Sequence, residues 1–554
     1  MNYRASELSG RIEVARDVWG TAAQAHFESD DIPSMDDEVI DVEDFLAGLL
    51  PHAGRFVSWL GDPSAPLRAW TARALGALGQ LARDPYTVPD EQAPALAALL
   101  DAARPGLRGL VLDRSAGVRA FAVQALGCIG GPRQGERDDD DEDATPVDYA
   151  DPADAAALDS ALGDRSGAVR KEAVIALASC SGLAAAPRLA GLGDDPSPRV
   201  RSQVTDTLVE MKSPRAVPLL LARIRAAGPR GDWLDLMSLR SFSADAAEAR
   251  AALVPLIGPE ARKDTRQQAA QTLVAYVDRS CLPALLALLP AHDHESVYAA
   301  IALGRLGAEV PSAPLIAGLS SEAGVAERLT TTCSWALAAT GRADGLDRLI
   351  ELFDAAVVRQ RDAVDGAVPV AIHPGHLLPA MAMFEDRRMH AVALRTLAKK
   401  PAWGERHACL ALGVCGDPAG VPHLRAALRA TPTPASVQGW TESYRLHAAI
   451  GLALLDPEVV GVEWDATGGW PGRIATYEIE TLVLAFAIRL LGRRLLGRRL
   501  GRGARALVAA SRAFAERLLR ETPHWGGGIW SGYTHYMPAL AEEARTSLAQ
   551  VADE

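Results

Sequence analysis

The amino-acid sequence predicts an all-α fold, namely a right-handed α-solenoid of stacked helix pairs. Three observations lead to this expectation. A short phrase of apolar and charged residues recurs in the first part of the chain. Alanine and leucine dominate, while aromatic residues make up only 5%. A chain of 554 residues is also too long for one compact core, unless it is elongated and each unit contacts only its neighbours.

The recurring phrase first runs from Asp62 to Leu78, and it returns beginning at Asp113, Asp164 and Asp195. Counted from the aspartate, an aliphatic residue stands at position +5, arginine at +6, leucine at +13 and a bulky apolar or sulfur-containing residue at +16. Self-similarity of this kind is typical of stacked helical repeats.

The apolar positions of the phrase follow the periodicity of an α-helix, because their spacing lines one stripe of the helix surface. The opening aspartate and the serine two residues later suit a helix start, where their side chains accept backbone N–H bonds. A Gly-containing break and a second apolar segment follow, so each unit is a helix pair. The residue at +12 is small, which lets a neighbouring helix approach closely. It is Ala74, Ala125, Ala176 or Thr207 in the four copies.

The second copy, with Asp113, Val118, Arg119, Ala122 and Leu126, resembles the HEAT-repeat family. The resemblance is to the bacterial variety of the repeat, which phycobilin-lyase-type proteins share. It implies an armadillo-type superhelix, and it implies that aspartate and arginine side chains form a ladder between successive repeats. The residues that would supply this ladder are Asp62/Arg68, Asp113/Arg119, Asp164/Arg170 and Asp195/Arg201.

Weaker copies of the phrase continue to residue 456. Two of them, at 266–273 and 296–307, keep the helical stripe but lose the Asp–Arg pair. We therefore expect four parts in the chain. They are an N-terminal acidic arm and capping helix at 1–47, regular repeats at 48–230 with an acidic insertion at 131–152, degenerate repeats at 231–456, and a C-terminal helical cap with an arginine-rich helix at 457–554.

Two acidic segments interrupt the pattern. The N-terminal part predicts one helix over 11–27, followed by a stretch rich in acids and without a base. The insertion contains the run Asp138–Asp143, in which a cation-binding loop can be drawn, but it lacks the turn glycine and the terminal glutamate of a calcium loop. Blocks of like charge are usually solvated, so we favour an acidic loop over a cation site.

A basic helix is predicted near the C-terminus, because residues 481–515 contain no acid and arginines punctuate a leucine-rich stretch. Arginines four residues apart, such as Arg489 and Arg493, share a helix face, and Ile488 and Leu491 supply an opposing apolar stripe. One interpretation is a docking helix for an anionic surface, such as nucleic acid, anionic lipid or an acidic partner. The other, which we favour, is a capping helix whose arginines are solvated or paired with acidic neighbours.

The histidines do not assemble a recognisable catalytic constellation. His292 and His294 are metal ligands by type, but we favour a helix start in which Asp293 acts as a cap. His373 and His376 are expected in a loop. We therefore assign no catalytic, cofactor-binding or metal-binding residue.

Composition narrows the class of protein further. The net charge of −13 argues against a surface-wide nucleic-acid groove, and the best apolar run, 481–488, is too short to cross a membrane. Six cysteines do not make a disulfide framework in a chain of this length, and Cys180 falls on a core position of the repeat. The absence of a membrane-length apolar run indicates a cytoplasmic protein. Trp70 and Trp233 stand isolated in the sequence, which argues against the aromatic-bearing basic face of a HEAT-like DNA glycosylase.

The sequence therefore favours a non-enzymatic scaffold or adaptor that binds a protein partner along its concave surface. One alternative is a HEAT-like lyase or a metal-dependent enzyme that uses the histidines of the second half. Another is binding of nucleic acid or lipid through the arginine-rich helix. Specific contacts with a partner are expected in the segments that lack the recurring phrase. The candidate residues are Arg493, Arg494, Arg498, Arg499, Trp525, Trp530 and Tyr533.

Overall fold

A computed structural model of the chain describes residues 46–47, 49–83, 88–131, 151–231, 233–242, 245–320, 322, 324–363, 372–399, 404–429, 438–456, 478–496, 505, 508–509, 511–513, 515–516 and 537–552. Every regular element in these ranges is helical, which confirms the all-α class. The helix expected over 11–27, the acidic run Asp138–Asp143, and Arg498, Arg499, Trp525, Trp530 and Tyr533 lie outside them.

The chain divides into two compact units. The first extends to Ala222 and takes in residues 241–243, and the second comprises Arg223–Arg240 and the residues from Ala244 onward. The division falls within helix α11 (Ala216–Ala227).

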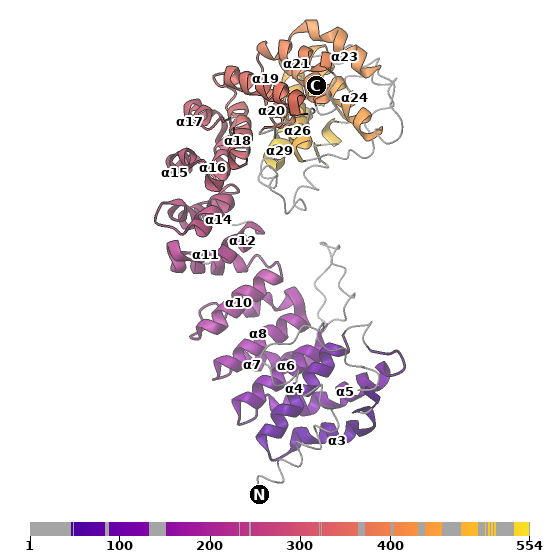
Figure 1. Ribbon diagram of the computed structural model, residues 1–554. Helices are drawn as coiled ribbons and strands as arrows, with labels where there is room; N and C mark the ends of the chain where they lie inside the picture. Colours follow the sequence, from indigo (N-terminus) through magenta and orange to yellow (C-terminus); the bar gives the residue numbers. More distant parts are fainter. Residues whose placement is uncertain are drawn as a thin grey trace. The chain divides into compact units, whose positions relative to one another are not determined.

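The first unit stacks its helices in two layers (Figure 1). The recurring phrase forms one layer, and the second apolar segments of the repeats form the other. The phrase helices are α4 (Ala65–Leu81), α6 (Ala116–Gly130), α8 (Gly167–Ser181) and α10 (Pro198–Glu210). The other layer contains α3 (Ala53–Ser58), α5 (Ala93–Leu110), α7 (Pro152–Ala161) and α9 (Ala186–Ala190), with the 3₁₀ turns η1 (Leu50–His52), η2 (Trp59–Gly61) and η3 (Gly182–Ala185).

The second unit continues the same stacking of helix pairs, although its sequence has lost most of the phrase. One layer holds α12 (Trp233–Arg240), α14 (Lys263–Leu273), α16 (His294–Leu306), α18 (Val325–Ala339), α20 (Pro374–Met381), α22 (Glu405–Val414) and α24 (Gln438–Leu455). The other holds α13 (Ala246–Leu253), α15 (Leu282–Leu288), α17 (Ser312–Ala317), α19 (Leu346–Ala363), α21 (Arg388–Lys399) and α23 (Val421–Leu428).

Short 3₁₀ turns join or extend the helices of the second unit, and a final helix pair packs at its C-terminal end. The turns are η4 (Gly228–Arg230), η5 (Val254–Ile257), η6 (Arg279–Cys281), η7 (Leu289–Ala291), η8 (Gly307–Glu309) and η9 (Pro418–Gly420). The final pair is α26 (Glu478–Leu495) and α29 (Met537–Ala552).

Close packing of the phrase helices depends on small residues, as the +12 position predicts. Gly127 of α6 lies against Ala176 of α8, and a Cβ atom added to Gly127 would stand only 2.5 Å from the Ala176 Cβ. The apolar stripe is buried in the core of the first unit, where Val118 and Leu126 are 1% and 0% exposed. Burial of one such leucine contributes about 1.5–3 kcal/mol, so the stripe supplies the main driving force for stacking.

One helical stretch among the described residues, Gly167–Ala190, is long and apolar enough to cross a membrane by length and composition, with a mean hydropathy of 1.5. It comprises α8, η3 and α9, and it bends at Gly182, whose φ is +49°. Val169 and Leu177 of α8 are completely buried in the core of the first unit. The stretch is therefore an interior helix of the stack.

Candidate functional site

Ladder arginines in the first unit bind the aspartate that opens the following repeat. Nε and Nη2 of Arg119 donate to the two carboxylate oxygens of Asp164 at 2.7 and 2.8 Å. Arg170 makes the same fork on Asp195, with both bonds at 2.7 Å. Such two-pronged pairs fix the guanidinium plane as well as the distance. The remaining pair of this kind is Arg68 with Asp113, whose Nε–Oδ2 bond is 2.9 Å.

Each ladder arginine also holds its own repeat together. Nη1 of Arg119 donates to the backbone carbonyl of Asp113 at 2.9 Å. The Asp113 carboxylate in turn accepts the backbone N–H of Ser115 at 2.8 Å, which starts helix α6. One Asp–Arg set therefore joins a helix start, its preceding turn and the next repeat. The ladder that the HEAT resemblance implies is confirmed, and its residues have a structural role.

The pKa values of the ladder groups follow from these contacts. The hydrogen bond from Arg119 lowers the pKa of Asp164, although burial acts in the opposite direction. The hydrogen bond from Arg170 lowers the pKa of Asp195 in the same way. These carboxylates are ionised at neutral pH and fully hydrogen-bonded, so they are not available as general acids or metal ligands.

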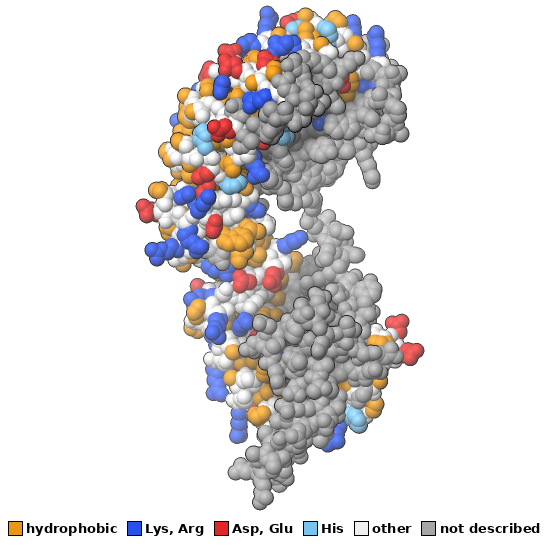
Figure 2. Space-filling model, viewed as in Figure 1, with side chains coloured by type: hydrophobic (Ala, Val, Ile, Leu, Met, Phe, Trp, Pro, Cys, Tyr) orange, Lys and Arg blue, Asp and Glu red, His pale blue; other side chains and the backbone are white. Residues whose placement is uncertain are grey.

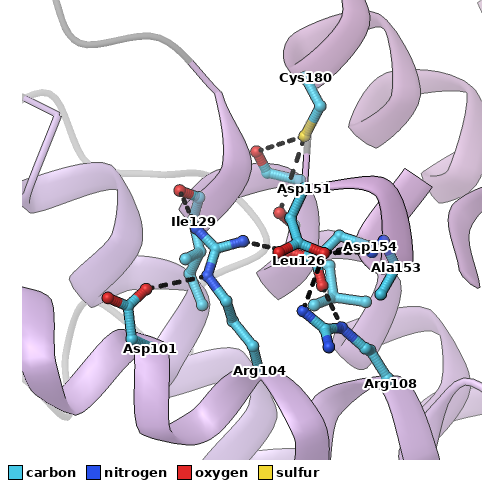
Figure 3. A network of polar contacts seen from close by, with 10 residues as sticks. Asp101, Arg104, Arg108, Leu126, Ile129, Asp151, Ala153, Asp154 and Cys180 are labelled. Atoms are coloured by element: carbon cyan, nitrogen blue, oxygen red, sulfur yellow. Dashed lines mark hydrogen bonds and ion pairs between the residues drawn. The ribbon is translucent and has the colours of Figure 1, made fainter. Parts of the chain in front are cut away.

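A second polar cluster in the first unit centres on Asp154 of α7, which is 0% exposed (Figure 3). Arg104 and Arg108, one turn apart on α5, converge on its two carboxylate oxygens. Arg108 also donates to Asp151 at 3.1 Å, and Arg104 donates to the carbonyl of Ile129 at 3.4 Å. No pattern in the amino-acid sequence indicates this cluster, because its members come from separate repeats. It ties α7 to α5 and leaves neither oxygen of Asp154 free to meet a ligand.

Ion pairs between helices persist in the second unit with different residues. Arg266 of α14 pairs with Glu295 of α16 at 3.1 Å, and Arg250 pairs with Asp278 at 2.8 Å. The degenerate copies lack the Asp–Arg pair of the phrase, but Arg266 has a carboxylate partner of another kind. A glutamate one repeat further along the chain, rather than an aspartate of the phrase, supplies the carboxylate.

The segment from His292 to Glu295 starts a helix, as we favour from the sequence. Asp293 caps α16 by accepting the Ser296 backbone N–H at 3.0 Å, and the Ser296 hydroxyl accepts the Asp293 N–H at 3.2 Å. Glu295 is completely buried against Arg266. Among the residues that the structure describes, no group of three or more His, Cys, Asp and Glu side chains is arranged to hold a metal ion.

His373 and His376 belong to a helix start, so the expectation of a loop is wrong. His373 caps α20, its Nδ1 accepting the Gly375 backbone N–H at 3.1 Å. His376 lies within α20 and meets Glu327 of α18, with 3.2 Å between Nδ1 and Oε1. Burial and the neighbouring His376 lower the pKa of His373, which favours the neutral ring that a cap requires.

The cysteines are free thiols, and most of them are buried. Cys180 occupies the core position that the repeat predicts and is 0% exposed. Burial raises the pKa of Cys180 and Cys333 to about 12, and that of Cys128 to about 11. Because the thiolate is the reactive form, these cysteines are not nucleophiles at neutral pH.

The arginines of α26 differ in their contacts and in their exposure. Arg494 donates to the carbonyls of Gly413 and Val414, at the end of α22, at 3.0 and 2.8 Å. Arg489 pairs with Glu543 of α29 at 2.8 Å. These contacts favour the capping interpretation of the basic helix for both residues. Arg493 is exposed, and it stays a candidate for partner contact.

The two tryptophans that look isolated in the sequence have different surroundings. Trp70 packs in an aromatic cluster with Phe56 and Trp59, at ring-centroid distances of 6.0 and 6.5 Å. Trp233 is 42% exposed on α12, next to the exposed Leu234 and Met237. The sequence holds the signal for this surface, since Trp233, Met237 and Arg240 follow helical spacing, but it does not reveal that the stripe faces outward.

The fold and its ladder define the class of protein, an all-α solenoid of stacked helix pairs. Residues 155–230 match the family model of HEAT repeats. At the level of fold, the stacked helix pairs of this chain resemble HEAT repeats.

Solved structures of other repeat proteins resemble this chain at low identity. An engineered protein from the Northeast Structural Genomics Consortium is 16% identical, with 90% of this chain and 98% of that chain covered and a TM-score of 0.27. Yeast importin-β (Kap95p) is 14% identical, with 97% and 75% covered and a TM-score of 0.39. Kap95p in a structure with RanGDP is 12% identical, with 93% and 74% covered and a TM-score of 0.40. No curated protein sequence matches the chain.

Proposed function

We propose that this chain is a non-enzymatic HEAT-repeat scaffold or adaptor that binds a protein partner along one face of its stacked helices. The observation that carries the proposal is the ladder. Arg119 with Asp164 and Arg170 with Asp195 hold successive helices in one fixed register. A stack of this kind presents a long preformed surface, which favours recognition of an extended partner.

The titratable groups that could suggest catalysis have structural roles instead. Asp293 caps a helix, Glu295 pairs with Arg266, and His373 caps α20. The free thiols support a reducing compartment, so a cytoplasmic location is part of the proposal.

The proposal is tested by cross-linking the full chain in cells, followed by affinity capture and mass spectrometry. We expect reproducible cross-links from the exposed faces of the described helices to one protein partner. A chain that yields no specific partner at any cross-linker length contradicts the proposal.

The alternative of metal-dependent chemistry has its own measurement. Elemental analysis of the purified protein is expected to give no stoichiometric metal. Iron or zinc at one equivalent, lost when His292 and His294 are replaced by alanine, would establish the enzymatic alternative instead.

Arg493 is the described member of the candidate contact set that remains exposed, and it has a matched control on the same helix. We expect Arg493→Ala to weaken capture of the partner and to leave thermal stability unchanged. Arg489→Ala, which removes a pair with Glu543, serves as the control for loss of charge on α26. Unchanged capture by Arg493→Ala removes this residue from the interface.

A further inference from the structure

Helix α12 of the second unit exposes an apolar stripe. Trp233 is 42% exposed and Met237 is 39% exposed, and Arg240 continues the same stripe one turn further on, because the three residues stand at i, i+4 and i+7. Figure 2 shows hydrophobic side chains gathered where Figure 1 places α12. Tryptophan and methionine are enriched at contact surfaces, and large side chains exposed side by side are unusual elsewhere.

A cationic cluster adjoins this stripe. Tyr298 of α16 and Arg328, in the first turn of α18, are half-buried, as is Arg240. Burial raises the pKa of Tyr298, while both guanidinium groups act to lower it. Burial lowers the pKa of Arg240, because the guanidinium has lost part of its hydration.

The cluster differs from the arginine sites in the rest of the stack. Arg266 and Arg250 of the same unit each pair with a carboxylate, at 3.1 and 2.8 Å. Among the described residues, no carboxylate pairs with Arg240 or Arg328. A partly desolvated cation without a counter-charge is unfavourable, so a carboxylate that arrives with a ligand gains a strong charge-assisted hydrogen bond there.

We propose that the α12 surface, defined as Trp233, Met237, Arg240, Tyr298 and Arg328, docks a peptide segment of the partner that carries carboxylates beside a large apolar side chain. This rests on the proposed function and specifies the partner's chemistry. The apolar side chain packs on Trp233 and Met237, and the carboxylates meet the two arginines.

A peptide fits this surface better than a nucleic acid. Phosphate backbones are bound by rows of cations, and the α12 surface offers two guanidinium groups. One or two carboxylates next to an apolar anchor match both the charge and the stripe.

The test measures fluorescence anisotropy of labelled peptides with the full chain. The probe is a short peptide that alternates glutamate with leucine and has phenylalanine at its centre. The comparison probes are the same peptide with glutamine in place of glutamate and a short oligothymidylate. We expect the acidic peptide to bind, and the neutral peptide to bind at least about tenfold more weakly, since a hydrogen bond to a charged group carries that much.

Three substitutions locate the binding site. Arg240→Gln and Arg328→Gln are each expected to weaken binding of the acidic peptide about tenfold. Trp233→Ala tests the contribution of the stripe, and because the Trp233 side chain is exposed, its removal does not disturb the core. Arg279→Gln is the matched control, because Arg279 is 83% exposed and has only a surface pair with Glu309. Melting temperatures of all four variants are measured alongside, and Trp233→Ala keeps the test valid where an arginine variant folds poorly.

Three results would overturn the proposal: no binding of the acidic peptide, unchanged binding by both Arg240→Gln and Trp233→Ala, or tighter binding of the oligothymidylate that depends on the same residues. Cross-linking in cells distinguishes failure of the α12 docking proposal from failure of the proposed function. If a partner is still captured equally by the double variant Trp233→Ala/Arg240→Gln, the scaffold function stands and the α12 surface is excluded. If wild-type protein captures no partner, the proposed function itself fails.

Discussion

At the scale of single residues, one arginine per repeat connects three backbone segments. Arg119 is 4% exposed, and its fork on Asp164 and its bond to the Asp113 carbonyl use most of its donors. A buried guanidinium is stable only when paired in this way. Removal of one partner therefore leaves an unpaired buried charge, which is more damaging than loss of a surface pair.

Arg119→Ala is expected to lower the free energy of unfolding of the first unit by about 3 kcal/mol. Arg348→Ala, which breaks the exposed pair with Glu351 in the second unit, is expected to change the free energy of unfolding of that unit by less than about 1 kcal/mol. Urea unfolding followed by circular dichroism measures both. Equal effects of the two substitutions would contradict a structural role for the ladder.

The ladder also predicts sensitivity to acid. The pKa of Asp164 is lowered in the folded chain, so its stabilisation is present above the pKa of an unfolded aspartate, about 3.9. It is lost as the pH falls from there through the folded-state pKa. Asp164→Asn should therefore unfold at a lower urea concentration than wild type at pH 7. Between about pH 4 and pH 3, its free energy of unfolding should fall by less than that of wild type. Parallel curves for the two proteins would exclude this carboxylate as a source of acid sensitivity.

Arg494 is a candidate for partner contact from the sequence, but in the structure it caps a helix. Its guanidinium meets carbonyls at the end of α22, where the helix dipole favours positive charge. We expect Arg494→Ala to destabilise the second unit by about 1–3 kcal/mol, because two carbonyls lose a charged donor. Arg493→Ala should leave the melting temperature unchanged, and a comparable loss of stability in both variants would contradict the distinction.

At the scale of helices, small side chains at the contact set the distance between neighbouring helices. The layer of phrase helices packs through glycine and alanine, and Gly127 faces the Cα and Cβ of Ala176 directly. A methyl group at Gly127 would have to push α6 and α8 apart along their whole contact.

Gly127→Ala is expected to destabilise the first unit by about 1–3 kcal/mol through overpacking. Gly109→Ala in α5 is the matched control, because a Cβ there meets nothing within 4 Å and alanine favours helix. The control should be neutral or stabilising by up to about 1 kcal/mol. Thermal melts of the two variants give the comparison, and destabilisation by both would mean that backbone effects rather than packing dominate.

Element boundaries are the part of the secondary structure that sequence reasoning places least well. Asp293 is recognised as a helix cap from its residue type, and α16 confirms it. His373 is not a common capping residue, so the start of α20 is missed. The structure reveals the cap, because the neutral His373 ring accepts the Gly375 N–H.

At the scale of the whole molecule, the ladder of the first unit ends at Arg201. Its Nη1 binds the Asp195 carbonyl at 2.7 Å like the other ladder arginines, but among the described residues no carboxylate completes the pair. The division between the two compact units follows shortly afterwards in α11. The end of the ladder and the end of the first unit therefore fall in the same region of the chain.

Two compact units predict two unfolding transitions in differential scanning calorimetry. Arg119→Ala should lower the midpoint of one transition, and Arg266→Ala, which removes the partner of the buried Glu295, should lower the midpoint of the other. A single transition shifted by both substitutions would show that the solenoid unfolds as one cooperative body.

The candidate surfaces were less predictable than the fold. Spacing alone indicates that Arg489 and Arg493 share a helix face, but it does not show that Arg489 meets Glu543 fifty-four residues later. The α12 surface is not predictable from the sequence for a similar reason. The stripe of Trp233, Met237 and Arg240 looks like any amphipathic helix until its orientation toward solvent is known.

The repeat, the helix pair and the residues of the first-unit ladder can all be predicted from the amino-acid sequence. This was possible because helical spacing, capping residues and the Asp–Arg phrase are local patterns that recur with little change. The tertiary structure was needed to show that Glu295 completes the pair of Arg266, that Asp154 binds two arginines, and that no carboxylate among the described residues pairs with Arg240 or Arg328. These features depend on which residues of different repeats come together, and stacking settles that after the helices have formed.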